Sequence, residues 1–268
     1  MGKIREMRYI KPVAEKPVSI LDEKLIISDL HLGIERSLEE EGIRVPNQTD
    51  RLKKRINKII EEIKPEEIIL LGDVKNQVPG LSWQERKEIP LLLKFLSEKV
   101  NKIRITPGNH DGKIGGLVPD ELNEKVCIED TRGLILDKAA FLHGHTWPKK
   151  NVFKKEEILI GHNHPVVSFE DEFERIIDER CWIEAKLKKK PIREKYGEID
   201  WNSPSLIIQP AFNDLTGGIS FNSPSDSFLG PFFNSGSVSL KESKIYLLDG
   251  TYLGKLGQLN KPERKCER

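Results

Sequence analysis

The chain has 268 residues, with 44 basic and 43 acidic side chains, a formal net charge of +1 and 37% hydrophobic residues. This length suffices for a proper core, and this balance of apolar and charged residues excludes a disordered chain and a wholly basic nucleic-acid binder. Because no apolar run approaches the ~20 residues of a membrane span and the first residues, MGKIREMRYI, lack a signal-peptide core, we expect a cytoplasmic protein with no membrane partner.

The first half of the chain predicts alternating strands and helices. We expect strands at Leu25–Ile27, Ile68–Leu71 and Lys102–Thr106, and helices that include Leu52–Ile63 and Ile89–Leu96. Asn47 and Thr49 are candidate caps of the first helix, and Pro90 is acceptable only in the first turn of the second. The β-α-β-α-β order predicts a parallel sheet, with the ligand-binding residues at the carboxyl ends of its strands.

The second half predicts another sheet, largely antiparallel and packed on the first. Its expected strands are Lys125–Glu129, Leu134–Leu136, Ala139–Leu142, Ile158–Ile160, Val166–Phe169 and Leu206–Gln209, followed by a hairpin of Val238–Leu240 and Ile245–Leu248 that turns at Glu242-Ser243. Residues 170–203 form a charged stretch, and residues 213–235 form a long loop whose four phenylalanines favour packing. With no clear linker, we expect a single domain over residues 1–268, with a core at about 24–254 and a charged insertion at 170–203.

All six histidines fall in short motifs where a predicted strand ends or turns. The motifs are Asp29-Leu30-His31, Gly108-Asn109-His110-Asp111, His143-Gly144-His145 and Gly161-His162-Asn163-His164, and Gly72-Asp73 adds a further carboxylate. Alternate residues of an extended segment point the same way, so each x-His-x-His pair can aim both rings at one point. Imidazoles with carboxylates suit divalent Mn, Fe, Zn or Ni. This set exceeds the needs of one ion and suits two ions about 3.5–4 Å apart.

The order and spacing of these motifs resemble the calcineurin-like metallophosphoesterase superfamily. Its pattern is D-x-H, G-D, G-N-H-[DE], a histidine, and G-H-x-H, and all five blocks stand in order between Asp29 and His164. The resemblance implies an α/β fold, a four-layer α/β/β/α sandwich of two mixed sheets. It also implies a dinuclear phosphoesterase with no covalent phospho-enzyme.

Position by position, the resemblance implies two metal sites that share one carboxylate. The first would be formed by Asp29, His31, Asp73 and His164, and the second by Asp73, Asn109, His143 and His162. In the motif at His143, His145 is an alternative ligand. In similar proteins the residue that ends the strand binds the metal, which favours His143 and leaves His145 near the substrate.

The catalytic residues are expected to be His110, as general acid or phosphate-stabilising imidazole, and Asp111, which would orient it. Lys75 is a candidate phosphate contact, although a solvated loop lysine is an equal alternative, and Asn76 can supply a further polar group. Two ions, most simply Mn²⁺, would hold a bridging hydroxide that attacks phosphorus while His110 protonates the leaving alkoxide.

The substrate is less specified than the chemistry. Gly72-Asp73-Val74-Lys75, Pro210-Ala211-Phe212-Asn213 and Leu248-Asp249-Gly250 resemble the SbcD-related or Icc-like group, which implies a nuclease linked to DNA repair and a helicase partner. The alternatives are a small-molecule or nucleotide phosphodiesterase or phosphatase and, from another class, a scaffold without metal, which the full ligand set disfavours.

One basic stretch bears on nucleic acid. Residues 186–195 read KLKKKPIREK, and Trp182, Tyr196 and Trp201 lie beside them, which allows phosphate contact and base stacking. The alternative, a solvated surface insertion, is the favoured interpretation.

Overall fold

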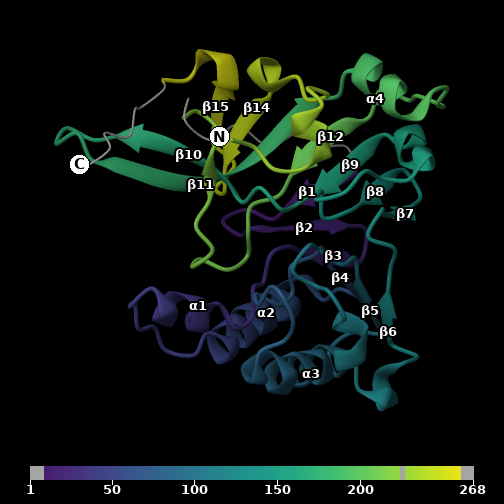
Figure 1. The fold of residues 1–268 in the computed structure, drawn as a ribbon, viewed down its shortest axis with the longest axis vertical. Helices are drawn as coiled ribbons and strands as arrows, with labels where there is room; N and C mark the ends of the chain where they lie inside the picture. Colours follow the sequence, from purple (N-terminus) through teal and green to yellow (C-terminus); the bar gives the residue numbers. More distant parts are fainter. Residues whose placement is uncertain (1–8, 224–226, 261–268) are drawn as a thin grey trace.

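The computed structural model describes residues 9–223 and 227–260, and Figure 1 shows two sheets packed on one another with helices outside them. The first sheet has the strand order β1-β2-β3-β4-β5-β6. Its strands are β1 (Lys11–Pro12), β2 (Val18–Leu21), β3 (Lys24–Ile27), β4 (Glu67–Leu70), β5 (Lys102–Ile105) and β6 (Val126–Ile128). Strands β3, β4 and β5 run parallel as predicted, while β1 and β2 add an antiparallel edge that the sequence analysis did not predict.

Helices α2 (Thr49–Ile63) and α3 (Trp83–Ser97) cover one face of this sheet, and α1 (Ile34–Glu40), which was not predicted, precedes them. Helix α2 buries Leu52, Ile56 and Ile59 because these residues recur every three or four positions and so lie on one side. They pack against Leu25 and Ile27 of β3, on the helical side of the sheet.

Two local predictions about these helices are wrong. The N-cap of α2 is Gln48, whose side chain makes no capping bond, and the Asn47 side chain accepts from the backbone N–H of Thr49. Pro90 lies inside α3, because the helix already begins after a capping box in which Ser82 and Glu85 satisfy each other's backbone N–H groups.

The second sheet has the order β13-β10-β11-β12-β9-β8-β7, and β14 joins β11 to β15. Its strands are β7 (Leu134–Leu136), β8 (Ala139–Phe141), β9 (Glu157–Ile160), β10 (Pro165–Glu170), β11 (Ile176–Lys186), β12 (Ser205–Ile208), β13 (Ile219–Ser220), β14 (Lys244–Leu247) and β15 (Tyr252–Lys255). Strands β8, β9 and β12 run parallel to one another, and the remaining pairs except β10 with β13 are antiparallel. The sheet is therefore mixed.

Alternation along the strands divides the apolar residues into three cores, which define four layers. Ile69 of the first sheet meets Phe141 and Trp182 of the second, so the middle core lies between the sheets. The outer face of the second sheet carries Ile158 and Ile160, which pack with residues of the outermost layer. That layer includes α4 (Lys189–Tyr196) and α5 (Pro231–Asn234). The expected α/β/β/α sandwich is confirmed.

Two strands predicted for the second sheet are placed differently. Residues 126–128 form β6 and pair in parallel with β5, so this run extends the first sheet. The hairpin expected to turn at Glu242-Ser243 is also wrong, since Leu240–Glu242 is a short 3-10 helix. Strand β14 instead pairs with β15, across a turn at Leu248-Asp249.

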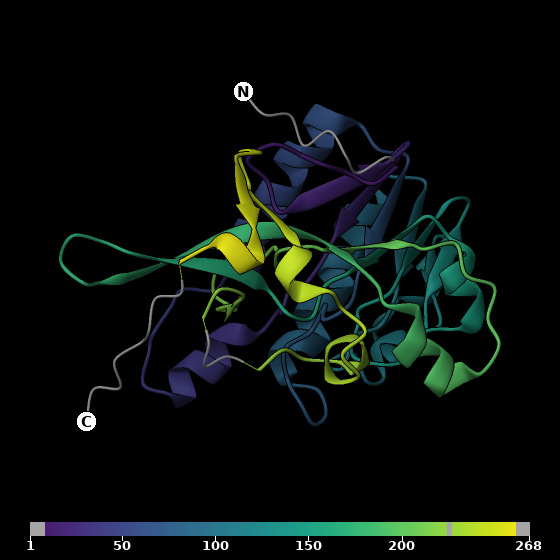
Figure 2. The ribbon, with the colours of Figure 1, turned by 90° about the horizontal axis from the view of Figure 1, so that it is seen from above.

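The charged stretch 170–203 is not a peripheral insertion throughout. Its residues 176–186 form β11, the longest strand described, which pairs with β10, β12 and β14. In Figure 2 the ends of β10 and β11 extend away from the body of the molecule. Trp182 and Cys181 of β11 are fully buried, on opposite faces of the sheet.

The described parts of segment 213–235 pack as their phenylalanines predict. Phe221 and Phe232 are buried, and Phe228 and Phe233 lie against Phe221 with ring centroids 4.5 and 6.0 Å away. Cys127 and Cys181 are free thiols, while Cys266 lies outside the described residues. Among the helices of residues 9–223 and 227–260, none is long and apolar enough to span a membrane.

The position of Ile69 between the sheets can be tested by stability. Ile69 is fully buried, whereas Ile43 is 51% exposed, so the same substitution has different consequences. We expect Ile69→Ala to lower the free energy of unfolding by about 2–5 kcal/mol and Ile43→Ala by less than ~0.5 kcal/mol, measured by urea denaturation. Equal effects would contradict the sandwich.

Candidate metal centre

The candidate site lies where strands of both sheets end. Loops after β3, β4 and β5 bring in Asp29, Asp73 and His110, and the loops after β8 and β9 bring in His143 and His164. Because the strands within each of these sets are parallel, their carboxyl ends share one edge. Backbone hydrogen bonds then join neighbouring loops: the backbone N–H of His31 donates to the backbone oxygen of Asp73 at 2.8 Å.

One group of donors consists of Asp29, His31 and His164, whose ligand atoms all lie within 4.8 Å of one another. Nε2 of His164 is 3.2 Å from Oδ1 of Asp29 and 3.3 Å from Nε2 of His31. Burial, together with the neighbouring His164, lowers the pKa of His31 to about 4. The ring is therefore neutral near pH 7 and has the lone pair that a cation requires.

A second group consists of Asp73, His143 and His162. Nε2 of His143 is 3.1 Å from Oδ2 of Asp73 and 3.2 Å from Oδ1 of Asn109. Burial and the positive charge of His143 lower the pKa of His162 to about 3, so this ring too is neutral.

Asp73 connects the two groups. Its Oδ2 faces His143 in one group and lies 3.6 Å from Nε2 of His31 in the other, and a third donor group contains His31, Asp73 and His110. Burial opposes charge on both residues of the closest pair, but their attraction outweighs it. It lowers the pKa of Asp73 and raises that of His143 to about 9.

The chemistry of this donor set fits divalent cations. Fully or nearly fully buried carboxylates at Asp29 and Asp73 need a positive counter-charge, and the imidazole nitrogens of several histidines converge on the same points. Mixed oxygen and imidazole donors suit Mn, Fe, Zn or Ni. Seven residues that the sequence analysis expected as metal ligands lie together here, namely Asp29, His31, Asp73, Asn109, His143, His162 and His164.

Five of these seven residues have a left-handed backbone. Their φ angles are 57° at Asp29, 44° at His31, 47° at Asp73, 69° at His162 and 41° at His164. Non-glycine residues seldom adopt this region, although Asp and His do so more readily than most, and such strain concentrates at functional sites. Each strand thus turns abruptly at its end and directs its polar side chain back over the sheet edge.

Three glycines leave room for the donors. A Cβ atom added at Gly72 would lie 2.3 Å from Nδ1 of His143, and one at Gly108 would lie 2.1 Å from Oδ1 of Asp73. One at Gly161 would lie 2.1 Å from the hydroxyl oxygen of Ser28. The glycines of the G-D, G-N-H-D and G-H-x-H motifs are therefore required by close packing.

His110 lies at the cavity with its side chain 27% exposed, but Asp111 does not orient it as expected. Nδ1 of His110 faces the backbone oxygen of Asn76. The buried carboxylate of Asp111 accepts from the backbone N–H groups of Val74, Lys75 and Gly108, and so ties two loops together. Burial and the negative charge of Asp73 raise the pKa of Asp111 to about 6.

Asn76 contacts neighbouring side chains of the site instead of facing the open cavity as a substrate contact would. Its side-chain oxygen lies 3.1 Å from Nδ1 of His31, its amide donates to Ser37, and its backbone oxygen faces His110. One residue thereby contacts two histidines of the site. The sequence pointed to Asn76 but not to these contacts.

The two other expected substrate contacts differ from each other. Lys75 is 1% exposed, and its ammonium group donates to the backbone oxygens of Gln77 and Gly80, so the expected phosphate contact is wrong. His145 lies beside the centre, with its ring centroid 5.5 Å from that of His143. Within the described residues its buried Nδ1 has no hydrogen-bond partner. Burial and the nearby charge of His143 lower the pKa of His145 to about 4.

A cavity of about 260 Å³ opens over the donors and includes residues that the sequence analysis missed. The segment 213–235 contributes Thr216, Gly218 and Leu229 to its wall. Asn163 holds this segment in place, since its side chain accepts from the N–H of Leu229 at 2.8 Å and donates to the Leu229 oxygen at 3.1 Å. The position of Asn163 between His162 and His164 is the sequence feature that could have indicated a role at the site.

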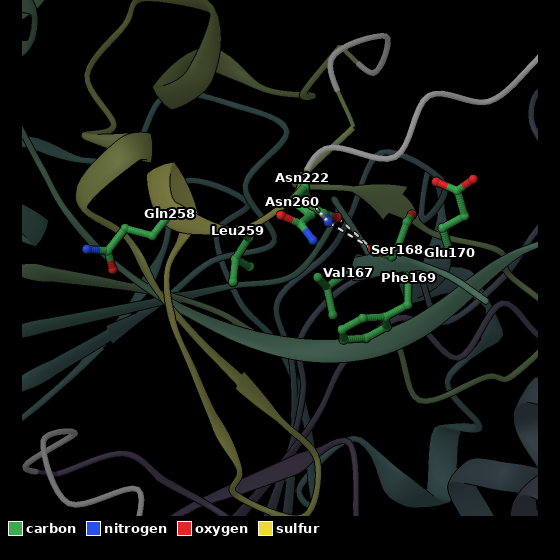
Figure 3. A pocket seen from close by; sticks show the side chains of 8 residues that line it. All are labelled: Val167, Ser168, Phe169, Glu170, Asn222, Gln258, Leu259 and Asn260. Carbon is green, nitrogen blue, oxygen red and sulfur yellow. Dashed lines mark hydrogen bonds between the residues drawn. The ribbon is translucent and has the colours of Figure 1, made fainter. Parts of the chain in front are cut away.

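A larger cavity, of about 620 Å³, lies elsewhere on the second sheet, as Figure 3 shows. The Asn222 side chain there is occupied by the backbone of Ser168 and Asn260. Glu170 is the only carboxylate among its lining residues, and no imidazole joins it. Its lining therefore lacks a donor set like that of the smaller cavity.

Comparisons with known proteins agree with this geometry. The family model described as calcineurin-like phosphoesterase matches residues 25–204. No curated protein sequence matches the chain.

Two solved structures show the extent of structural similarity. The crystal structure of the Pseudomonas putida nuclease MPE shares 18% identity with a TM-score of 0.52, covering 89% of this chain and 95% of that one. The E. coli phosphoesterase YfcE shares 16% identity with a TM-score of 0.35, covering 57% and 75%. At such identity, the likeness to the nuclease supports the fold alone.

The close approach at Gly108 generates a prediction with a matched control in the same loop. A methyl group at Gly108 would collide with Asp73, whereas one at Gly112 would meet nothing within 4 Å. We expect Gly108→Ala to weaken Mn²⁺ binding about 10–100-fold by isothermal titration calorimetry, and Gly112→Ala to leave it unchanged. Unaltered binding by Gly108→Ala would show that Asp73 does not hold the cation.

Proposed function

The chain belongs to the calcineurin-like phosphoesterase family and is a metal-dependent phosphoesterase, and from this premise we propose that it hydrolyses phosphodiesters at two divalent cations. The observation that carries the proposal is the overlap of the donor groups. Asp29, His31 and His164 form one group, Asp73, His143 and His162 form another, and Asp73 also lies in a group with His31. A single ion cannot use all these donors, whereas two adjoining ions can.

The proposed ligands follow from these groups. Asp29, His31, Asp73 and His164 would hold one cation, and Asp73, Asn109, His143 and His162 would hold the other. We propose Mn²⁺, with Fe, Zn or Ni as alternatives, because the donors mix oxygen with imidazole nitrogen. Two bound cations would supply charge neutralisation at the phosphoryl group and a water molecule of lowered pKa.

His110 is suited to deliver a proton to the leaving group. The Asn76 carbonyl oxygen can only accept a hydrogen bond, so the Nδ1 atom facing it carries a hydrogen. Nε2, which is 3.9 Å from Oδ2 of Asp73, is then the nitrogen that gains and loses a proton at the cavity. The backbone of Asn76 therefore performs the orienting role first expected of Asp111.

The cavity favours a substrate that extends beyond the site. Its volume of about 260 Å³ is smaller than the ~300–1,000 Å³ of pockets that enclose a whole ligand. A cavity of this size would take a phosphoryl group and leave the flanking groups on the surface, which supports a phosphodiester substrate. A nuclease of the SbcD-related or Icc-like group, with a role in DNA repair and a helicase partner, is the finer proposal; a small-molecule phosphodiesterase is the alternative.

The acid role of His110 predicts a selective loss of turnover. We expect His110→Ala to lower kcat for a dinucleoside monophosphate with Mn²⁺ about 10²-fold or more, because the leaving alkoxide loses its proton donor. The same variant should lower kcat for bis(p-nitrophenyl) phosphate much less, because p-nitrophenolate leaves without being protonated. Its metal content, measured by mass spectrometry, should equal that of the wild type. A variant that loses its metal as well would instead indicate a ligand role for His110.

Metal removal supplies the test of the dinuclear centre. We expect EDTA-treated protein to lack hydrolysis and to bind two equivalents of Mn²⁺, with a rise in Tm because the cations bind only the folded chain. Asp73→Asn should bind fewer than two equivalents, since Asp73 faces both donor groups. One equivalent in the wild type would contradict the proposal.

A further inference from the structure

Beside the candidate metal centre, three arginines surround one aspartate. Nη2 of Arg51 and Nη1 of Arg55 lie 2.9 and 3.0 Å from Oδ2 of Asp214, and Nη1 of Arg180 lies 2.8 Å from its Oδ1. Arg51 and Arg55 are one turn apart on α2, while Arg180 comes from β11. We call these three arginines with Asp214 the arginine cluster.

The arginine cluster carries more positive charge than its aspartate neutralises, with three guanidinium groups against one carboxylate. Burial, together with Arg180 and Arg51, lowers the pKa of Arg55 despite the attraction of Asp214. Among the described residues, Nη2 of Arg55 and Nη2 of Arg180 have no hydrogen-bond partner, and the Arg51 side chain is 55% exposed. The cluster can therefore accept a further anion.

The loop that carries Asp214 is attached to the metal-binding loop. The N–H of Phe212 donates to the Ser28 oxygen at 2.9 Å, and the Asn213 amide donates to the Leu30 oxygen at 2.8 Å. Two residues beyond Asp214, Thr216 lines the cavity over the donors. At most about 7 Å therefore separates the Cα atom of Asp214 from that of Thr216 in the cavity wall.

Strand register places the arginine cluster at the site and the lysine-rich stretch away from it. Arg180 pairs with Val166, two residues after His164. Lys186 pairs with Ser205, which in turn pairs with Glu157 at the start of β9, the end opposite His162. Six residues of strand, about 20 Å, separate Lys186 from Arg180, and α4 with its lysines follows Lys186.

We propose that the arginine cluster is a second phosphate site, which binds a backbone phosphate next to the scissile one and so selects a polynucleotide strand over a compound with a single phosphodiester. This inference rests on the proposed phosphodiesterase function and names its substrate class. Arg51, whose side chain is 55% exposed, and the half-buried Arg180 supply the donors, while Arg55, stacked 4.5 Å over the ring of Phe212, keeps the cluster in place.

The test compares substrates of different length. We measure kcat/KM with Mn²⁺ for a 12-nucleotide single-stranded DNA, a dinucleoside monophosphate and bis(p-nitrophenyl) phosphate, for the wild type and for Arg51→Gln/Arg180→Gln. For the double arginine variant we expect the ratio of kcat/KM for the 12-mer to kcat/KM for the dinucleoside monophosphate to fall about 10–100-fold. The fall should come from a higher KM for the 12-mer. For the 12-mer, the plot of log kcat/KM against log salt concentration should also become less steep, by about one for each arginine removed.

The matched control removes the same charge elsewhere. Lys189→Gln/Lys190→Gln, on the exposed side of α4, should keep the wild-type ratio and salt slope. Equal loss on all three substrates by the arginine variant, or a wild type that does not prefer the 12-mer, would overturn the second phosphate site while bis(p-nitrophenyl) phosphate hydrolysis still upheld the proposed function.

Failure of the proposed function has a separate signature. If the wild type with Mn²⁺ hydrolyses none of the three substrates, the phosphodiesterase proposal fails. Fluorescence anisotropy with a labelled 12-mer then decides the second phosphate site: weaker binding by the arginine variant than by the lysine variant supports it, and equal binding overturns it.

Discussion

The carboxylate of Asp73 faces histidines from both sheets, so the metal centre forms only when the two sheets pack with their strand ends at one edge. His31 approaches it from the first sheet at 3.6 Å and His143 from the second at 3.1 Å. The middle core, with Ile69 against Phe141 and Trp182, holds the sheets in this arrangement. Packing far from the donors therefore determines their separation.

The same constraint explains why the site is costly for the fold. Burial disfavours the charged form of Asp29 and Asp73, and both sit in left-handed backbone that an ordinary residue avoids. Histidine partners outweigh the effect of burial, so the pKa of both carboxyls is lowered, and bound cations would stabilise the carboxylates further. Stability and function thus compete at this sheet edge, and apolar packing in the three cores compensates elsewhere.

Predictions succeeded where they depended on periodicity or on a motif, and failed where they depended on the direction of an individual side chain. The burial of Ile56 and of Ile26 follows from helical and strand spacing. Lys75 is two residues from Asp73 in sequence and was a candidate phosphate contact. Its buried ammonium group instead donates to two backbone oxygens of its own loop. Asp111 was expected to touch His110 but bonds the backbone of two loops, because its burial brings three N–H groups closer than the imidazole.

By itself, the sequence determined the family, the alternating α/β order and the set of candidate metal ligands, because these depend on residue type and short spacing. Only the tertiary structure decided that β11 crosses the centre of the second sheet, that Asn76 contacts two histidines, and that Arg51, Arg55 and Arg180 gather around Asp214. The physical reason is sequence separation. A contact such as that between Arg51 and Asp214, 163 residues apart, is set by strand register and layer packing, which no local pattern encodes.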